Sequence, residues 1–305
     1  MNDTLERRVA TALARPVTQP VRAFAQMLGE DAGALAVLFY GSNLRTGSLD
    51  GVLDFYVLLP GAVERGIWPR VSYREWTWPD HDQNHAMRAK IATMTLATFH
   101  AAASGALLDT TIWARFVQPS ALAWQRDGAA AAQVVGAVGA AAVTAARLAA
   151  ALGPDEGQAE DYWRALFRAT YRAEFRVEKA GREDSILAAD PDHYAGLLPL
   201  ALSGAGIAME QAGGTLKPRI SHAERKAALR WWRWRQRLGK PYNLIRLIRA
   251  STTFEGAARY AAWKVERHTG VPVRLTPWRE RHPLLAAPTV LWQVWRARRQ
   301  QGEAR

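Results

Sequence analysis

A Gly-Ser turn followed by a buried carboxylate combines the residue types in this sequence that are best suited to chemistry. An apolar run over residues 36–40 predicts a buried strand, which Gly41 and Ser42 end. A second apolar run, residues 52–59, carries one acid, Asp54. The backbone N–H groups and the hydroxyl of such a turn can bind the triphosphate of a nucleotide. A carboxylate on the next strand can hold Mg²⁺ against the same phosphates.

One carboxylate alone leaves such a metal site incomplete. Nucleotidyltransferases usually carry two acids two residues apart on one strand, but Val52 and Tyr56 occupy those positions around Asp54. Asp50 lies four residues before Asp54. Four residues of extended strand span about 13 Å, which is too far for a shared metal. Either a second ligand comes from elsewhere in the chain, or Asp54 is a buried, hydrogen-bonded acid without a metal.

Composition narrows the class of protein. A chain of 305 residues, 49% of them hydrophobic, can form two domains or one domain with an extension. The sequence has no cysteine, which excludes a disulfide framework, a thiolate zinc site and a cysteine nucleophile. The first residues carry charges without the apolar segment of a signal peptide, so we expect an amphipathic helix there.

Positive charge is concentrated at the C-terminal end. The formal net charge is +12, but residues 217–305 carry 21 Lys and Arg against 5 Asp and Glu, or +16. The remaining residues therefore sum to −4. Seven of the 13 tryptophans lie in the same basic region. Basic residues interleaved with Trp can bind an anionic membrane surface or nucleic acid, and the alternative is a solvated basic surface around a few core Trp side chains.

Apolar patterns predict the other elements. Helices are expected over residues 1–30, 87–104, 128–152, 192–212 and 221–240. Strands are expected over residues 67–78 and 110–124, the second broken at Pro119. Arg115 falls inside that strand, where a buried guanidinium needs a structural carboxylate or a ligand phosphate as partner.

Two of the expected helices have further features. Residues 128–146 contain no charge over nineteen positions, about the length of a membrane span. Ala and Gly contribute little to insertion, so we expect a tightly packed helix of a soluble protein. The basic helix begins with Ser221 and has Glu224 three residues on, which is the pattern of a capping box.

Taken in order, seven short segments resemble those of one enzyme family, the mitochondrial-type CDP-diacylglycerol synthases. These are CTP:phosphatidate cytidylyltransferases of the translocator assembly and maintenance family. The segments are FYGSNLRTG, VLDFYVLL, RAKIATMTL, WARFVQP, LGPDE, YRAEFRVEKAGRED and NLIRLIRASTTFEGAARYAAWKVERHTG. The family's Trp-His…Asn…His-Tyr-Ser stretch has no clear counterpart. The closing segment has Thr-Thr-Phe-Glu-Gly where the family has Ser-Ser…Gln…Lys-Gly.

The resemblance implies a Mg²⁺-dependent enzyme that converts CTP and phosphatidate to CDP-diacylglycerol and pyrophosphate. Glu174 matches the family's Asp in the YRAEFRVEKAGRED segment, which makes it the predicted second metal ligand beside Asp54. Lys90, Arg115 and Arg176 match basic positions of the family. They are predicted to neutralise the triphosphate or the phosphatidate headgroup, with Lys90 counted among the catalytic residues.

The expected fold is α+β, with a polymerase-β-like nucleotidyltransferase domain over residues 1–125. A mostly helical, winged-helix-like domain is expected over residues 126–240, and a basic, Trp-rich, membrane-contacting region over residues 241–305. The resemblance implies a cytoplasmic protein, peripheral on the inner membrane, with no nucleic-acid partner and with its oligomeric state open. Two alternatives remain: a nucleotidyltransferase with an RNA or protein acceptor, and a non-catalytic nucleic-acid-binding protein.

Overall fold

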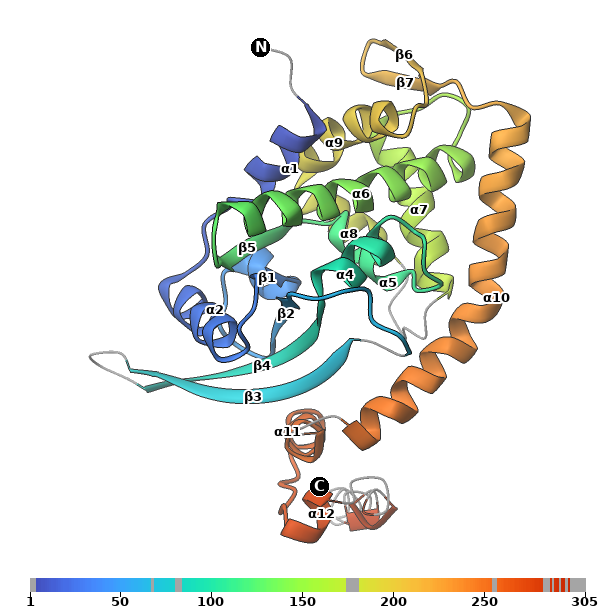
Figure 1. Ribbon diagram of the computed structural model, residues 1–305. Helices are drawn as coiled ribbons and strands as arrows, with labels where there is room; N and C mark the ends of the chain where they lie inside the picture. Colours follow the sequence, from blue (N-terminus) through green and yellow to red (C-terminus); the bar gives the residue numbers. More distant parts are fainter. Residues whose placement is uncertain are drawn as a thin grey trace.

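A mixed five-stranded sheet with helices on both faces forms one part of the protein, and helices form most of the rest (Figure 1). The computed structural model describes residues 4–66, 69–79, 84–173, 181–253 and 257–281, together with 286, 288–290, 292–293 and 296. The α+β class predicted from the sequence is confirmed.

The sheet has the strand order β3-β4-β2-β1-β5. At its centre, β1 (Ala36–Tyr40) and β2 (Leu53–Leu59) are antiparallel, and residues 41–52 connect them. On the other side of β2 lies β4 (Asn84–Thr95), which runs parallel to it. The edges are β3 (Arg70–Pro79) and β5 (Ser120–Gln125), each antiparallel to its neighbour. Both strands predicted around the Gly-Ser turn are therefore confirmed.

Successive side chains along a strand point to opposite faces of the sheet, so the core has two layers, one on each face. Phe39 and its neighbours on the same face pack with α2 (Gln19–Asp31), which covers one side of the sheet. Leu38 and Tyr56 point to the other side, where they join the larger core around α6 (Gly128–Leu152). That larger core includes buried residues of both ranges, 1–125 and 126–240.

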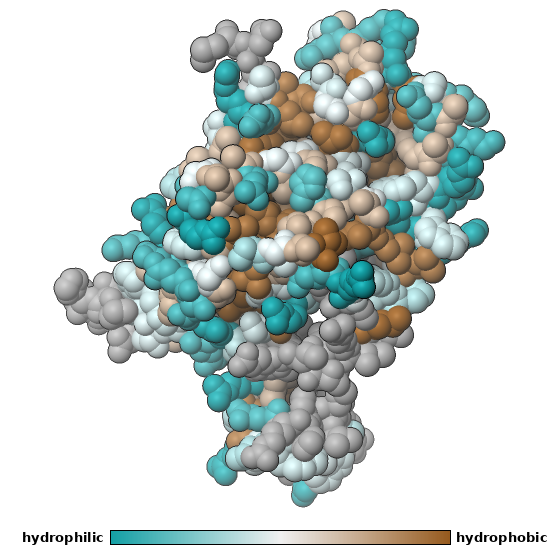
Figure 2. Space-filling view, in the orientation of Figure 1, coloured by the Kyte–Doolittle hydropathy of each residue, from teal (hydrophilic) through white to brown (hydrophobic). Residues whose placement is uncertain are grey.

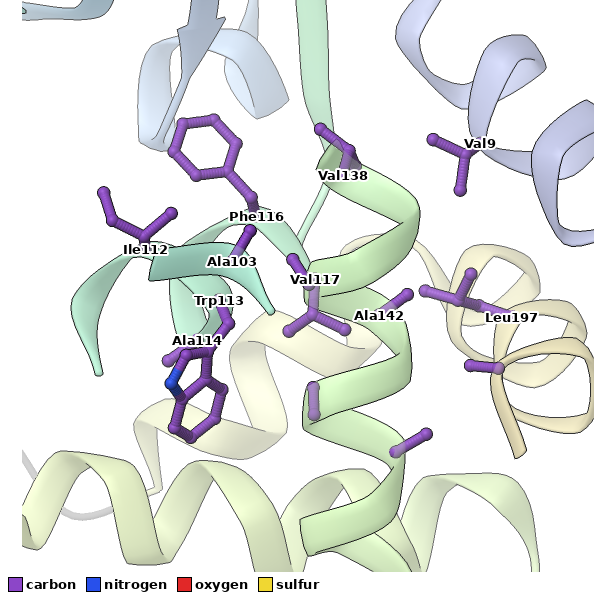
Figure 3. Close-up of a cluster of buried hydrophobic side chains, with 14 of the residues drawn as sticks. Val9, Ala103, Ile112, Trp113, Ala114, Phe116, Val117, Val138, Ala142 and Leu197 are labelled. Atoms are coloured by element: carbon purple, nitrogen blue, oxygen red, sulfur yellow. The ribbon is translucent and has the colours of Figure 1, made fainter. Parts of the chain in front are cut away.

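The central helix α6 is the Ala-rich segment of the sequence. Its small side chains let five helices pack against it: α4 (Leu96–Ala103), α5 (Thr111–Phe116), α7 (Ala159–Ala173), α9 (Pro191–Gly204) and α10 (His222–Thr253). Figure 3 shows Val9 and Leu197 on one side of α6, with Trp113 and Phe116 on the other. Among the described helices, α6 alone is long and apolar enough to cross a membrane, but 72% of its most apolar window is buried inside the protein.

The remaining elements follow the chain. They are α1 (Leu5–Leu13), α3 (Ser42–Thr46), α8 (Arg182–Ala188), β6 (Met209–Ala212), β7 (Thr215–Pro218), α11 (Ala257–Thr269) and α12 (Pro277–Arg281). The long helix α10 extends past the body of the molecule toward α11 and α12 (Figure 1). The predicted capping box at its start is confirmed, because Ser221 and Glu224 exchange hydrogen bonds between side chain and backbone.

Three predicted elements are right over only part of their length: residues 96–103 and 191–204 are helices, and residues 120–125 are a strand, but the rest of each prediction is wrong. Residues 87–95 are the second half of β4 and not a helix, because they pair with β2 along its whole length. Residues 111–116, predicted as strand, form α5, which buries its apolar side chains against α6. The helix predicted over residues 192–212 ends at Gly204, and β6 pairs with β7 around the Gly213-Gly214 turn.

Candidate functional site

The turn after β1 has a backbone that only glycine adopts readily. Gly41 has φ 94° and ψ −162°, and it is the residue before the short helix α3. The Asn43 side chain donates hydrogen bonds to the carbonyl oxygens of Ser48 (2.9 Å) and Asp50 (2.7 Å). Gly47, with φ 69°, ends α3. These contacts hold the polar loop in one conformation between β1 and β2.

The carboxylate of Asp54 lies against this turn. Asp54 is opposite Tyr40 in the β1–β2 register, one residue before the glycine. A β-carbon built on Gly41 would be only 3.3 Å from Oδ2 of Asp54. The turn backbone and the acid are therefore in contact, as a shared phosphate and metal site requires. Asp50 lies before β2 begins, so the structure does not bring it into this strand with Asp54.

Lys90 lies beside Asp54 on the neighbouring strand. The parallel register of β2 and β4 makes the two residues direct partners, and partners in a ladder point to the same face. On the far side of β4, Tyr73 of β3 is the partner of Lys90. Both Lys90 and Asp54 are half-buried. The site thus has one acid and one ammonium group side by side on the face of the sheet.

Arg115 approaches the same face from α5. Its Nη1 donates a hydrogen bond to the hydroxyl of Tyr56 (2.8 Å). Its guanidinium carbon is 5.2 Å from the ring centroid of Tyr40, a distance typical of a cation–π contact. Since Tyr40 is the register partner of Asp54, the structure brings Arg115 to the end of the sheet that carries the acid.

Two of the predicted site residues, Glu174 and Arg176, lie outside the described residues. Their roles stay predictions. Within the part of the chain that the structure describes, no three His, Asp or Glu side chains gather into a group that could hold a metal ion. A Mg²⁺ site at Asp54 therefore needs ligands from the undescribed segment, from water or from the nucleotide phosphates, which commonly complete such sites.

Sequence reasoning missed the two tyrosines that position Arg115. Tyr40 and Tyr56 looked like ordinary core residues of apolar strands. Their spacing from Asp54 was the available signal: Tyr56 is two residues after Asp54, so both side chains point to one face. Aromatic rings on the face that carries an acid can hold a guanidinium beside it.

A cluster of polar side chains, Tyr73, Glu75 and Arg88, lies next to Lys90 on the same face of β3 and β4. The hydroxyl of Tyr73 donates to Oε1 of Glu75 (2.9 Å), and Nε of Arg88 lies 3.6 Å from the same oxygen. The Arg88 guanidinium lies 5.5 Å from the Trp263 ring of α11. The basic C-terminal region is thereby joined to the sheet that carries the candidate site.

Comparison of the chain with protein-family models gave no match. Comparison with curated proteins gave no match either. Function must therefore be argued from the residues and geometry of the site.

Proposed function

We propose that this protein is a Mg²⁺-dependent cytidylyltransferase that converts CTP and phosphatidate to CDP-diacylglycerol and pyrophosphate. The contact between the Gly41 turn and Asp54 is the observation that supports it best. Lys90 and Arg115 add two positive charges near that acid, as a polyphosphate substrate requires. In this proposal residues 1–125 are a polymerase-β-like nucleotidyltransferase domain, residues 126–240 a winged-helix-like domain and residues 241–305 the membrane-contacting region.

In the proposed reaction, the residues of the site would have three roles: metal binding, phosphate binding and stabilisation of negative charge. Asp54, with Glu174 as second ligand, would hold Mg²⁺, which neutralises charge on the triphosphate when bound. The N–H groups and hydroxyl at Gly41-Ser42 would bind the phosphates. Lys90, Arg115 and Arg176 would stabilise the negative charge of the two substrates. All of these roles are binding and positioning of the substrates, which supply most of the rate acceleration in phosphoryl transfer.

The bonds that change are few. A phosphate oxygen of phosphatidate forms a bond to the α-phosphorus of CTP. The bond from that phosphorus to the oxygen bridging the β-phosphate breaks, and pyrophosphate leaves with the electron pair. The attacking oxygen is already anionic, so no residue has to remove a proton from it. The site therefore needs charge neutralisation and alignment more than a general base.

The proposed acceptor is a membrane lipid, which requires the protein to reach a bilayer. The C-terminal region supports this, since Trp278 and Trp292 expose 53% and 54% of their surface. Exposed Trp side chains among Arg and Lys are typical of interfacial segments that bind anionic lipid. We therefore propose a peripheral position on the cytoplasmic side of the inner membrane.

Pyrophosphate release is the direct test of the reaction. With purified protein, Mg²⁺, CTP and phosphatidate in anionic detergent micelles, we expect release that stops when either substrate is omitted. Chelation of Mg²⁺ with EDTA is expected to abolish it. Release without phosphatidate, or faster release with ATP, would indicate a nucleotidyltransferase with another acceptor. No release under any condition would favour the non-catalytic, nucleic-acid-binding alternative.

Membrane binding is tested by flotation. The protein is expected to float with vesicles that contain phosphatidate or another anionic phospholipid, and to stay behind with purely zwitterionic vesicles. Raising the salt from about 0.1 M to about 1 M shortens the screening length from about 10 Å to about 3 Å, so we expect most of the protein to be released. Equal flotation on both kinds of vesicle would contradict the role given to the basic residues.

A further inference from the structure

A groove between α6 and α10 lies apart from the candidate site described above. It has a volume of about 400 Å³, within the range of roughly 300–1,000 Å³ typical of small-molecule sites. Its walls are successive turns of the two helices, closed by the segments after α4 and α9. The lining residues are Ser104, Thr144, Arg147, Leu148, Ala205, Ile207, Ile220, Glu224, Ala227, Ala228 and Trp231.

The floor of the groove is apolar. Leu148 and Ile207 expose only 1% and 7% of their surface, and Trp231 packs beside them as a half-buried ring. A β-carbon on Gly105 would lie 3.0 Å from both Thr144 and Trp231, so the missing side chain at Gly105 lets those two residues close one end. Apolar surface of this kind favours a hydrocarbon chain over a polar ligand. Figure 2 shows further apolar residues exposed over the middle of the molecule, ringed by hydrophilic ones.

The two charged residues of the lining are not equivalent. The Glu224 carboxylate accepts hydrogen bonds from the N–H and the hydroxyl of Ser221 (2.9 and 2.6 Å). These bonds lower the pKa of Glu224, and they commit its negative charge to the start of α10. The positive charge of Arg147 also helps to lower the pKa of Glu224, but its exposed guanidinium makes no hydrogen bond within the described part of the chain. The Glu224 carboxylate is therefore held by Ser221, whereas the N–H donors of the Arg147 guanidinium remain available to a ligand.

We propose that this groove binds an anionic amphiphile with a single hydrocarbon chain, of the fatty-acid class. The chain lies on Leu148, Ile207 and Trp231, and the carboxylate pairs with Arg147. One guanidinium balances the single negative charge of a carboxylate and matches its two oxygens in bidentate geometry. The groove does not include Asp54 or its neighbours, so this binding is independent of the proposed cytidylyltransferase reaction.

Calorimetric titration with dodecanoate, below its micelle concentration, tests the proposal on the full chain. We expect saturable binding of dodecanoate and much weaker binding of dodecyltrimethylammonium, which has the same chain and the opposite charge. Butyrate, which has the charge and almost no chain, is expected not to bind. No saturable binding of dodecanoate, or equal binding of the cationic amphiphile, would overturn the proposal.

Four variants locate the site, two in the groove and two as controls. Arg147→Gln removes the cation from an exposed position and is expected to weaken dodecanoate binding about ten-fold, because the charge-assisted hydrogen bonds to the carboxylate are lost. Ala228→Leu fills the groove from α10 and is expected to abolish binding. Arg237→Gln makes the same charge change at an exposed residue of α10 outside the groove and is expected to bind normally. Unchanged affinity in both groove variants would overturn the assignment. Asp54→Asn is expected to bind dodecanoate normally, which separates this test from that of the reaction.

Discussion

Replacing Asp54 by Asn is expected to reduce CTP- and phosphatidate-dependent pyrophosphate release by about 1,000-fold or more. The amide has nearly the shape of the carboxylate but no negative charge, so it is a poor ligand for Mg²⁺. Losing one preorganised electrostatic group in an active site typically costs about 10²–10³ in rate, and here the loss also removes the metal. Activity is measured with saturating CTP at several Mg²⁺ concentrations, because a weakened metal site is expected to recover partly at high Mg²⁺.

Asp50→Asn is the matched control for that variant. It makes the same change in charge four residues earlier, at an exposed acid of the loop whose backbone carbonyl accepts from Asn43. The Asn43 bond does not involve the Asp50 side chain, so activity and melting temperature should match the unaltered protein. Equal losses in both variants would mean that the loop, and not the carboxylate at position 54, determines activity. Full activity of Asp54→Asn would remove the metal role from this residue.

The centre of the site was predictable because local signals agree there. Each apolar run of residues 36–40 and 53–59 is bounded by glycine-containing polar segments, which is how buried strands begin and end. Once the two strands pair antiparallel, the register that places Asp54 opposite Tyr40 also brings Asp54 close to Gly41. This part of the candidate site needed no information from distant parts of the chain.

The approach of Arg115 was not predictable from the same kind of pattern. The helix α5 has six residues, fewer than two full turns, so its apolar period is too short to distinguish from a strand. The sequence does carry a local turn signal just before the helix: Asp109 accepts hydrogen bonds from the N–H and hydroxyl of Thr111. Pro119, which disfavours helix in the residue before it, marks the other limit.

Lys90 illustrates how tertiary pairing overrides local preference. Residues 87–95 include Ala, Met, Lys and Arg, which are good helix formers, and so the sequence favours a helix. In the protein they pair with β2 on one side and β3 on the other, and that pairing satisfies their backbone hydrogen bonds in a strand. Lys90 lies beside Asp54 in the register of β2 and β4, but a strand positions it and not the predicted helix; its catalytic role stays a prediction. Glu174 and Arg176 lie outside the described residues and stay predictions.

Gly41→Ala is expected to lower activity through a steric effect, without any change in the charge of the site. At φ 94° and ψ −162° the backbone of Gly41 lies in a region that is essentially closed to other residues, at a cost of about 1–3 kcal/mol. The new methyl group would also lie 3.3 Å from Oδ2 of Asp54, so the carboxylate must shift by a few tenths of an ångström or more. Because misplacement of about 1 Å in a positioned group can cost about 10²-fold in rate, this smaller shift, together with the strained backbone, is expected to lower activity by about ten-fold.

Gly47→Ala separates strain from displacement of the acid. Gly47 also has a positive φ, 69°, but a β-carbon there would have no atom within 4 Å outside its immediate neighbours. An alanine in this left-handed conformation costs about 1–2 kcal/mol, so urea denaturation should show both variants to be less stable. Only Gly41→Ala should lose activity under conditions in which both proteins are folded, as judged by circular dichroism. If Gly47→Ala loses as much activity, the loop acts as a whole; if neither does, the contact between the turn and Asp54 has no catalytic role, and the proposed reaction loses its main support.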